Sequence, residues 1–401
     1  MARSRIPLVC TLLLTLGLVG CSPGASGGAA EGDTLTVYVS SPFRGASGPY
    51  GRAIREGAKL ALEDAGGRAG EVEIDMVALD DTGPGAAARW SPGAVAGNAR
   101  QATSDSGAIA YVGEFESGAT RVSLPVTNEA RMVQVSAAST ALDLVSPLPG
   151  SDEVPDLVQP SGERSFGRVI PDDEAQAGAG ALWAKRLGAR RIATVTDGSE
   201  FGEVVGDEFA EEAEGLGISL EATGRATERG LRSVSTTRPD LVYYGGTAEQ
   251  ALPFLLRVAR EAPSAMIMGT DALLLDASFL RRARPFEPRL RLTASAQDPS
   301  QLPRPEGQRF ARRYREQYGR EPHPYAAYGY EAAAVLIDSI ERAGGSVDRT
   351  TVIEAFLDTI DRRSVLGTYS IDEVGNTTLD RLAGYRISDG RPVFDEPLRA
   401  P

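Results

Sequence analysis

Short apolar runs alternate along the chain with longer segments of helical periodicity, beginning at Thr34. Such alternation is typical of βαβ units and of a largely parallel sheet. The elements predicted in the first part are strands at 35–39, 72–79, 108–112 and 132–135, and helices over 50–65 and from about 117.

A comparable series follows a Pro- and Asp-rich stretch at 146–162, which we interpret as the crossing into a second lobe. Its predicted helices cover 173–187, 201–216 and 248–261, and its strands 191–196, 241–244 and 265–268. Helices predicted at 306–318, 325–343 and 350–359, followed by short strands, exceed what one lobe needs. We therefore expect an α/β fold of two Rossmann-like lobes joined by a hinge, with segments exchanged between them. The predicted lobes are 34–163 with 298–369, and 164–297 with 370–398.

The first residues have the pattern of a processing signal. Arg3 and Arg5 precede an apolar run of about 13 residues, which is too short to span a bilayer and fits a signal peptide at 1–20. The run ends at Leu18-Val-Gly-Cys21, which resembles a bacterial lipobox with Cys21 as the lipidated residue. An ordinary signal peptide with a stray cysteine is the alternative. Residues 21–33 would then form a flexible tether that reaches about 20 Å.

Composition excludes several classes of function. The formal charge is −13, so the attraction to phosphate on which nucleic-acid binders depend is missing. Both cysteines lie at or before Cys21, and the single histidine, His323, stands between two prolines. Asp80 and Asp81 are adjacent at a strand end and would point to opposite sides. We therefore expect no metal, no cofactor and no enzymatic activity, although a hydrolase of unusual type stays a weaker alternative.

Small hydroxyl and glycine residues cluster where predicted strands end. In open α/β sheets, ligands bind beyond the carboxyl ends of strands, where helix N-termini favour an anionic group. Each residue considered alone could equally be a helix N-cap. The positions are Ser40-Ser41, Gly113 to Gly118, Ser136 with Ser139-Thr140, and Gly245-Gly-Thr247.

The order and spacing of several motifs resemble the leucine/isoleucine/valine-binding protein family, the type I periplasmic binding proteins of branched-chain amino-acid ABC transporters. The likeness covers about 34–393. The motifs are Val39-Ser-Ser-Pro42, Gly48-Pro-Tyr-Gly51, Arg55 to Asp64, Leu79-Asp-Asp81, Tyr111-Val-Gly113 with Ser117-Gly118, Val135 to Thr140, Asp197 to Gly202, Val242 to Gly246, Met268 to Asp271, and Pro324-Tyr325.

The resemblance implies how a bound amino acid would be held. Ser117 and Thr140 would hold its carboxylate, and the Ala138 carbonyl and Asp271 would hold its ammonium group. Asp271 stands where the family usually has Glu, and Thr247 stands where amino-acid binders place a pocket Tyr. The aromatic walls would be Tyr50, Phe201 and Tyr325. The segment 83–97, with Trp90 and Pro92, is longer and looser than the family's connection into its second helix.

We therefore expect an extracytoplasmic lipoprotein, held to the membrane only by a lipid anchor. It would bind a small ligand between its lobes, either an amino acid, with branched-chain amino acids as candidates, or another small carboxylate. Its partners would be the membrane permease and ATPase of an ABC importer, and we expect a monomer. The alternative is a sensory or regulatory lipoprotein of the same fold without a transport role. Sequence does not separate the two, because both need the same cleft.

Overall fold

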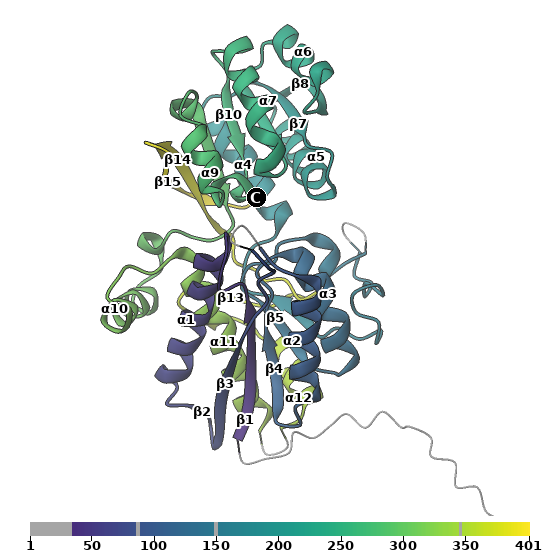
Figure 1. The fold of residues 1–401 in the computed structure, drawn as a ribbon, viewed down its shortest axis with the longest axis vertical. Helices are drawn as coiled ribbons and strands as arrows, with labels where there is room; N and C mark the ends of the chain where they lie inside the picture. Colours follow the sequence, from purple (N-terminus) through teal and green to yellow (C-terminus); the bar gives the residue numbers. More distant parts are fainter. Residues whose placement is uncertain (1–33, 86–88, 148–150, 345–346) are drawn as a thin grey trace, which may run out of the picture.

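The chain forms two α/β lobes, which lie one above the other in Figure 1. A computed structural model describes residues 34–85, 89–147, 151–344 and 347–401. The predicted signal peptide, Cys21 and the tether fall outside these residues. Within the described ranges, no helix has both the length and the apolar composition needed to cross a bilayer.

The first lobe is built on a sheet whose described strands follow the order β2-β3-β1-β4-β5-β6. All neighbours are parallel except β2, which pairs antiparallel with β3. The connection that follows β1 runs to β3 on one side, and the connection that follows β4 runs to β5 on the other side. Because these connections diverge, a crevice opens between the carboxyl ends of β1 and β4. The strands are β1 (Thr34–Ser41), β2 (Arg68–Ala69), β3 (Val72–Asp80), β4 (Ala108–Val112), β5 (Val133–Ser136) and β6 (Phe166–Arg168).

Helices cover both faces of this sheet. On one face lie α1 (Gly48–Asp64), α11 (Pro324–Ala343) and α12 (Arg349–Leu357), and on the other α2 (Pro92–Ser104) and α3 (Ser117–Glu129). Two glycines let α1 and α11 approach at backbone distance. A Cβ on Gly57 would lie 1.9 Å from the Ala326 carbonyl oxygen, and one on Gly329 would lie 2.2 Å from that of Ile54. A side chain at either position would force the helices apart.

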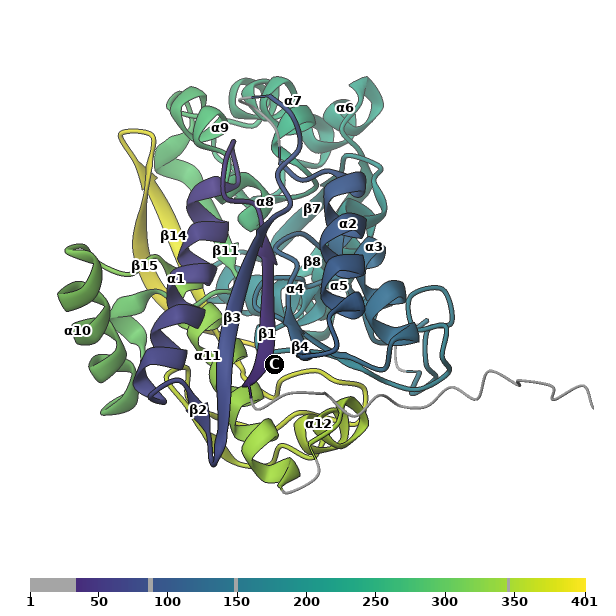
Figure 2. The same cartoon turned by 60° about the horizontal axis from the view of Figure 1, so that its bottom comes forward.

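The lobe is completed by short elements and by a helix that projects from its side (Figures 1 and 2). They are η1 (Leu142–Leu144), η3 (Pro299–Gln301), α10 (Glu306–Tyr318), β12 (Arg362–Arg363) and β13 (Thr368–Tyr369).

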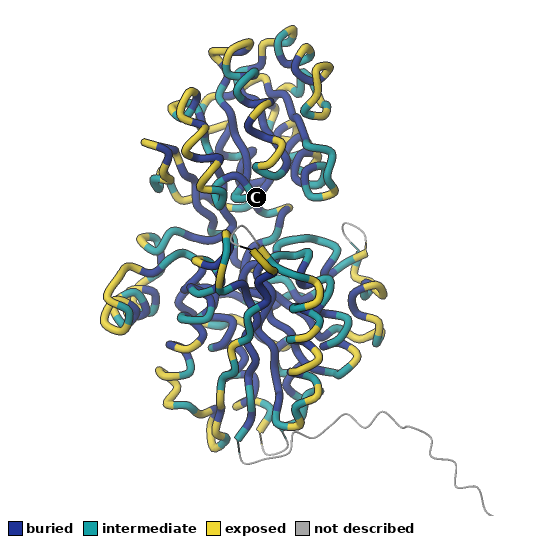
Figure 3. Tube along the Cα trace, viewed as in Figure 1, coloured by how far each residue is buried: buried dark blue, intermediate teal, exposed yellow. Residues whose placement is uncertain are grey.

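The second lobe has a sheet of order β15-β14-β11-β10-β9-β7-β8, in which β14 pairs antiparallel with both β11 and β15 and the other described neighbours are parallel. The strands are β7 (Arg191–Thr196), β8 (Ser219–Arg225), β9 (Leu241–Gly245), β10 (Met266–Gly269), β11 (Leu290–Ala294), β14 (Arg381–Ser388) and β15 (Arg391–Arg399). The helices are α4 (Asp173–Arg186), α5 (Glu200–Gly215), α6 (Glu228–Thr237), α7 (Ala248–Glu261), α8 (Asp271–Leu274), α9 (Ala277–Arg282) and η2 (Glu287–Arg289). Figure 3 shows the buried strands at the centre of each lobe and the exposed residues on the outer helices and loops.

The chain passes between the lobes three times, after β6, after β11 and before β14. Arg168, at the end of β6, is fully buried beside these connections. Its guanidinium donates to the Ala141 carbonyl (2.8 Å) and to Oδ1 of Asn376 (2.6 Å). One side chain therefore connects a loop of the first lobe to the third connection.

The structure confirms the predicted α/β fold, but it differs from the prediction in two segments. The stretch 146–162, interpreted as the crossing, returns to the first lobe, where Val158 packs with Leu144 and Phe166. β6 follows it and pairs with β5, although the predicted boundary at 163/164 placed β6 in the second lobe. The loose connection predicted at 83–97 contains the start of α2, which has Pro92 in its first turn after an extended Ser91.

Candidate functional site

A cleft of about 510 Å³ lies between the lobes, where the carboxyl ends of both sheets face each other. Seven of the eight predicted ligand-binding residues line it, and they come from five separate loops and the start of α11. They are Ser117, Ala138, Thr140, Phe201, Thr247, Asp271 and Tyr325. The fold thus gathers residues that are more than 200 positions apart in the sequence.

Tyr50, the eighth predicted residue, lies in an adjoining cavity of about 280 Å³. Asp271, Leu275 and Tyr325 line both spaces, so they form the wall between them. The Tyr50 hydroxyl donates to the Leu275 carbonyl (2.8 Å), which links α1 of the first lobe to the end of α8 in the second. Its ring stacks on Phe115, with centroids 5.5 Å apart.

The first-lobe wall consists of two loops that are tied together. Ser117 is the first residue of α3, and its Oγ accepts hydrogen bonds from the backbone N–H groups of Thr140 and Ala141, both at 3.2 Å. Those bonds use the lone pairs of the hydroxyl and leave its proton for a ligand. The positive end of the α3 dipole lies at the same place, which favours an anionic group.

Thr247, on the second-lobe wall, stabilises its own loop through hydrogen bonds. Its N–H (2.8 Å) and its hydroxyl (3.2 Å) both donate to Oδ2 of Asp197. Burial would raise the pKa of Asp197, but hydrogen bonds from Ser199 and Thr247 outweigh it and lower the pKa. Asp197 is therefore a charged anchor for this loop. Phe201, in the first turn of α5, contributes a partly buried ring beside it.

Asp271 begins the short helix α8 and is partly buried in the cleft. Burial raises the pKa of its carboxyl group to about 6, while hydrogen bonds from the Gln176 side chain and the Ser295 backbone N–H lower it in part. No ion pair involving Asp271 exists among the described residues. Its negative charge therefore remains to be balanced by a ligand.

Asp173, which the sequence reasoning missed as a site residue, lines the same cleft and is 3% exposed. Burial raises its pKa to about 7; the Thr140 hydroxyl lowers this value by a hydrogen bond, and the charge of Asp271 raises it further. Its Oδ1 has no hydrogen-bond partner in the described part of the chain. Its place at the start of a helix was the only sequence feature that could have identified it. Acidic residues are common there because they stabilise the helix N-terminus, whether or not they bind a ligand.

Charged residues at the rim of the cleft are paired with one another. Arg121 of α3 makes a two-pronged contact with Asp143, with both N–O distances at 2.6 Å, and approaches Glu200 of the second lobe at 3.8 Å. Arg89 pairs with Glu116 at 3.3 Å. The rim arginines are thus paired within the protein itself, whereas Asp173 and Asp271, deeper in the cleft, accept hydrogen bonds but form no ion pair among the described residues.

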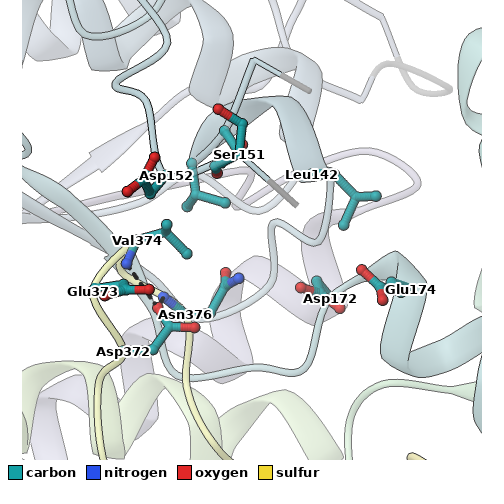
Figure 4. A pocket seen from close by; sticks show the side chains of 11 residues that line it. Leu142, Ser151, Asp152, Asp172, Glu174, Asp372, Glu373, Val374 and Asn376 are labelled. Carbon is teal, nitrogen blue, oxygen red and sulfur yellow. Dashed lines mark hydrogen bonds between the residues drawn. The ribbon is translucent and has the colours of Figure 1, made fainter. Parts of the chain in front are cut away.

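A second pocket, of about 350 Å³, lies on the side of the hinge (Figure 4). Asp172 and Glu174 at the start of α4 face the turn at 372–376, in which Oδ1 of Asp372 accepts from the N–H groups of Val374 and Asn376. This pocket contains none of the predicted site residues. Its acidic groups form no cluster suited to a metal ion, and no such cluster occurs elsewhere among the residues described.

His323 lies outside the cleft, in the lining of the adjoining cavity. Burial lowers its pKa to about 4, so it is neutral at physiological pH. Its Nδ1 accepts a hydrogen bond from the N–H of Tyr325, which caps α11. A helix-capping role accounts for this residue.

Comparisons with known proteins agree on one family. The sequence pattern of the family described as periplasmic binding protein matches residues 34–391. The Leu/Ile/Val-binding protein homolog 1 of Brucella melitensis biotype 1 is 25% identical over 376 residues, which cover 91% of this chain and 93% of the relative.

Solved structures have the same fold. A leucine binding protein, LivK, from Thermotoga maritima is 25% identical, with a TM-score of 0.71 over 91% of this chain and 99% of that one. A solute binding protein of an ABC transporter from R. palustris, solved in complex with benzoate, is 19% identical, with a TM-score of 0.68 over 92% and 97% of the two chains.

Proposed function

Because the chain belongs to the type I periplasmic binding protein family, we propose that it binds an α-amino acid in the cleft between its lobes and delivers it to an ABC importer. Contacts from both lobes favour the closed state, so the ligand would shift an open–closed equilibrium. The proposal includes no catalytic step. It assigns the protein to the extracytoplasmic side, tethered through a lipidated Cys21.

The observation that carries the proposal is the pair of carboxyl groups on Asp173 and Asp271. Both line the cleft, both have a raised pKa, and neither forms an ion pair within the described residues. The charge of buried Arg168 lowers the pKa of Asp173 only in part. Two acids without an ion pair in a partly buried space favour a ligand that brings its own positive charge. An ammonium group is the cation that an amino acid supplies.

The opposite wall suits a carboxylate. Ser117 offers a hydroxyl proton at the N-terminus of α3, and Thr140 stands in the neighbouring loop. A ligand with a negative group here and a positive group at Asp271 would span the two lobes. A zwitterionic amino acid has that distribution of charge.

Aromatic rings indicate an apolar ligand side chain. Phe115, Phe201 and Tyr325 line the cleft, and the Phe115 and Tyr325 rings meet edge to face with centroids 5.1 Å apart. The T. maritima relative is described as a leucine binding protein, which fits such walls. Benzoate, the ligand of the R. palustris relative, has no cation to offset Asp173 and Asp271. We therefore favour an apolar amino acid over an aromatic acid.

A thermal-shift panel tests the proposal. Protein freed of ligand by unfolding and refolding would be heated with leucine, isoleucine, valine, phenylalanine or benzoate. A ligand that binds only the folded state stabilises it by about 2.7 kcal/mol at a concentration of 100 Kd. We expect a raised melting temperature with at least one of the amino acids. A shift with benzoate alone, or with none of the five compounds, would contradict the proposal.

A further inference from the structure

Two acidic side chains are sealed beneath the loop that carries Ser117. Asp81 follows β3 and is 0% exposed, and Glu114 follows β4 and is 1% exposed. Their carboxyl groups lie within hydrogen-bonding reach of each other. Neither residue lines the cleft.

The hydrogen bonds of this pair are incomplete. The Tyr111 hydroxyl donates to Oε1 of Glu114 at 2.7 Å. The Ser40 and Ser123 hydroxyls lie near enough to the Glu114 carboxyl group to lower its pKa, but Oε2 of Glu114 and both oxygens of Asp81 accept no hydrogen bond within the described residues, and neither residue forms an ion pair there. Two ionised carboxylates in contact, both cut off from water, would repel each other strongly. A single proton between them would turn the repulsion into a hydrogen bond.

The charges around Asp81 and Glu114 also favour a bound proton. Burial and the neighbouring acidic groups raise the pKa of Asp81, and burial raises that of Glu114. Two arginines that contact the acidic residues flanking the pair are used there, since Arg44 pairs with Asp80 at 2.6 Å and Arg89 pairs with Glu116. The groups that face the pair or bond to it are Ser40 of β1, Asp80 of β3, Asn98 of α2 through Ser40, Tyr111 of β4, Glu116 of the next loop and Ser123 of α3.

The backbone of Glu114 joins the two ligand loops of the first lobe. Its carbonyl accepts from the hydroxyls of Ser136 (3.0 Å) and Ser139 (3.1 Å), and its N–H donates to the Thr120 hydroxyl (3.2 Å). The preceding Gly113 has a φ of 159°, and a Cβ there would lie 2.9 Å from the Ser40 carbonyl oxygen. The loop therefore has little freedom to absorb a movement of Glu114.

The backbone of Asp81 reaches the same loop from the other side. Its carbonyl accepts from the N–H of Ser91 at 2.9 Å. The neighbouring Trp90 ring packs on Gly118, where a Cβ would lie 3.0 Å from the ring. A change in the distance between the two carboxyl groups would therefore also move Trp90 and the start of α3.

We propose that Asp81 and Glu114 share one proton and that this proton holds the loop Gly113–Ser117 in its ligand-binding position. Both are positioning residues, because they act through the backbone of that loop and do not touch the cleft. When the pH rises far enough to remove the proton, repulsion separates the two carboxylates, and the loop moves with Glu114. This inference does not depend on which ligand the cleft binds.

Infrared spectroscopy of the whole ligand-free protein tests the first half of the proposal. At about pH 8.5, the carboxyl groups of Asp173 and Asp271 are mostly ionised, given pKa values of about 7 and about 6. A carbonyl stretch of a protonated carboxyl group should remain and should disappear as the pH rises further. It should be absent from the double variant Asp81→Asn/Glu114→Gln. It should be present in Asp80→Asn, where loss of the Asp80 charge should let it disappear at a lower pH than in the wild type. Asp80 is a matched control because it is the adjacent carboxylate and its pKa is lowered to about 2.

Fluorescence tests the second half. The chain has two tryptophans, so Trp183→Phe leaves Trp90 as the reporter of the loop. In that background, Trp90 emission should change over the pH range in which the infrared band is lost. The change should be absent when Asp81→Asn/Glu114→Gln is added and retained with Asp80→Asn.

Either measurement can overturn the proposal. The absence of a protonated band at about pH 8.5 would rule out the shared proton, and loss of the band without a change in Trp90 emission would rule out the positioning role. If the double variant does not fold, carboxyl ¹³C labelling of aspartate and of glutamate in the wild type makes the assignment. Each label should shift part of the band, and a band that responds to only one of the two labels would contradict a proton shared between Asp81 and Glu114.

Discussion

The acidic groups of the cleft and those beneath it have opposite surroundings. Asp173 and Asp271 line a cavity that admits a ligand, whereas Asp81 and Glu114 are sealed under the ligand loop. Burial raises the pKa in all four residues, and none of them forms an ion pair within the described chain. A ligand cation can reach only the first pair. The second pair can be neutralised only by a proton.

Repulsion between buried carboxylates therefore has two different effects, depending on whether a ligand can reach the carboxylates. In the cleft, repulsion between the carboxylates is relieved when an ammonium group binds, so the cost of holding them close together favours a cationic ligand. Under the loop, the same repulsion is relieved permanently by a proton at neutral pH, so it fixes a position. Four predictions test this division, beginning with the largest effect.

Removing the charge of Asp271 should have the largest effect on binding. Asp271→Asn keeps the size of the side chain but leaves the ligand ammonium group without its partner on the second lobe, which costs about 2–4 kcal/mol, or about 30- to 1000-fold in affinity. Calorimetric titration measures this loss. Thr247→Ala is the matched control and should cost less than about fivefold, because the Thr247 hydroxyl bonds to Asp197. Equal losses in the two variants would contradict the role given to Asp271.

Affinity should fall in mild acid. The pKa values of Asp173 and Asp271 in the free protein are about 7 and about 6, so both gain protons as the pH falls from 7.5 to 5. Binding of a cation must then displace a proton, which weakens affinity by about 10-fold if the proton comes from Asp271 and by about 100-fold if it comes from Asp173. Titrations across this range measure the slope. An affinity that is flat or rises toward pH 5 would show that the ligand does not meet these groups as a cation.

Asp173→Asn should weaken binding by about tenfold, or about 1.4 kcal/mol, which is less than the loss at Asp271. Asp173 is the more buried of the two, and the Thr140 hydroxyl already bonds to it. The substitution also removes the group that titrates at about 7, so the acid limb of the binding profile should move toward the lower pKa of Asp271. A profile that keeps its wild-type midpoint would show that the proton on Asp173 is not linked to ligand binding.

The same Asp173→Asn variant should make the ligand-free protein more stable by about 1 kcal/mol at pH 8. The folded-state pKa of Asp173 lies above its usual 3.8, so its carboxyl group destabilises the fold increasingly as the pH rises through that interval. The gain should therefore shrink toward pH 4, where the group is protonated in the folded state and about half protonated in the unfolded state. Thermal unfolding at the two pH values measures it. A gain that is larger at pH 4 would reverse the sign that the structure predicts.

The sequence predicted the elements that have strong local signals. The strand at 108–112 and the helices at 248–261 and 306–318 were predicted with the bounds that the structure shows, because each has a clear period and clear ends. The start of α2 was missed because glycine and alanine at 93–97 give no apolar stripe. There, the extended Ser91 and the fixed φ of Pro92 begin the helix.

The ligand-binding residues also differ in how well the sequence could predict their positions. Seven residues taken from the family resemblance converge on one cleft, while Tyr50 lies in the neighbouring cavity. Asp173 could not be singled out, because its place in the cleft depends on where the chain crosses after β6. Glu114 was likewise hidden, because its burial beside Asp81 follows from the pairing of β1 with β3 and β4.

The central claim is that Asp173 and Asp271 select a ligand by its ammonium group. The most direct test is a calorimetric titration of the ligand-free protein with leucine, isoleucine, valine and phenylalanine, each beside the matched acid that lacks the ammonium group. The account predicts that at least one amino acid binds and that its matched acid binds at least about 30-fold more weakly, or about 2 kcal/mol. A matched acid that binds as tightly as its amino acid, or tighter, would contradict it.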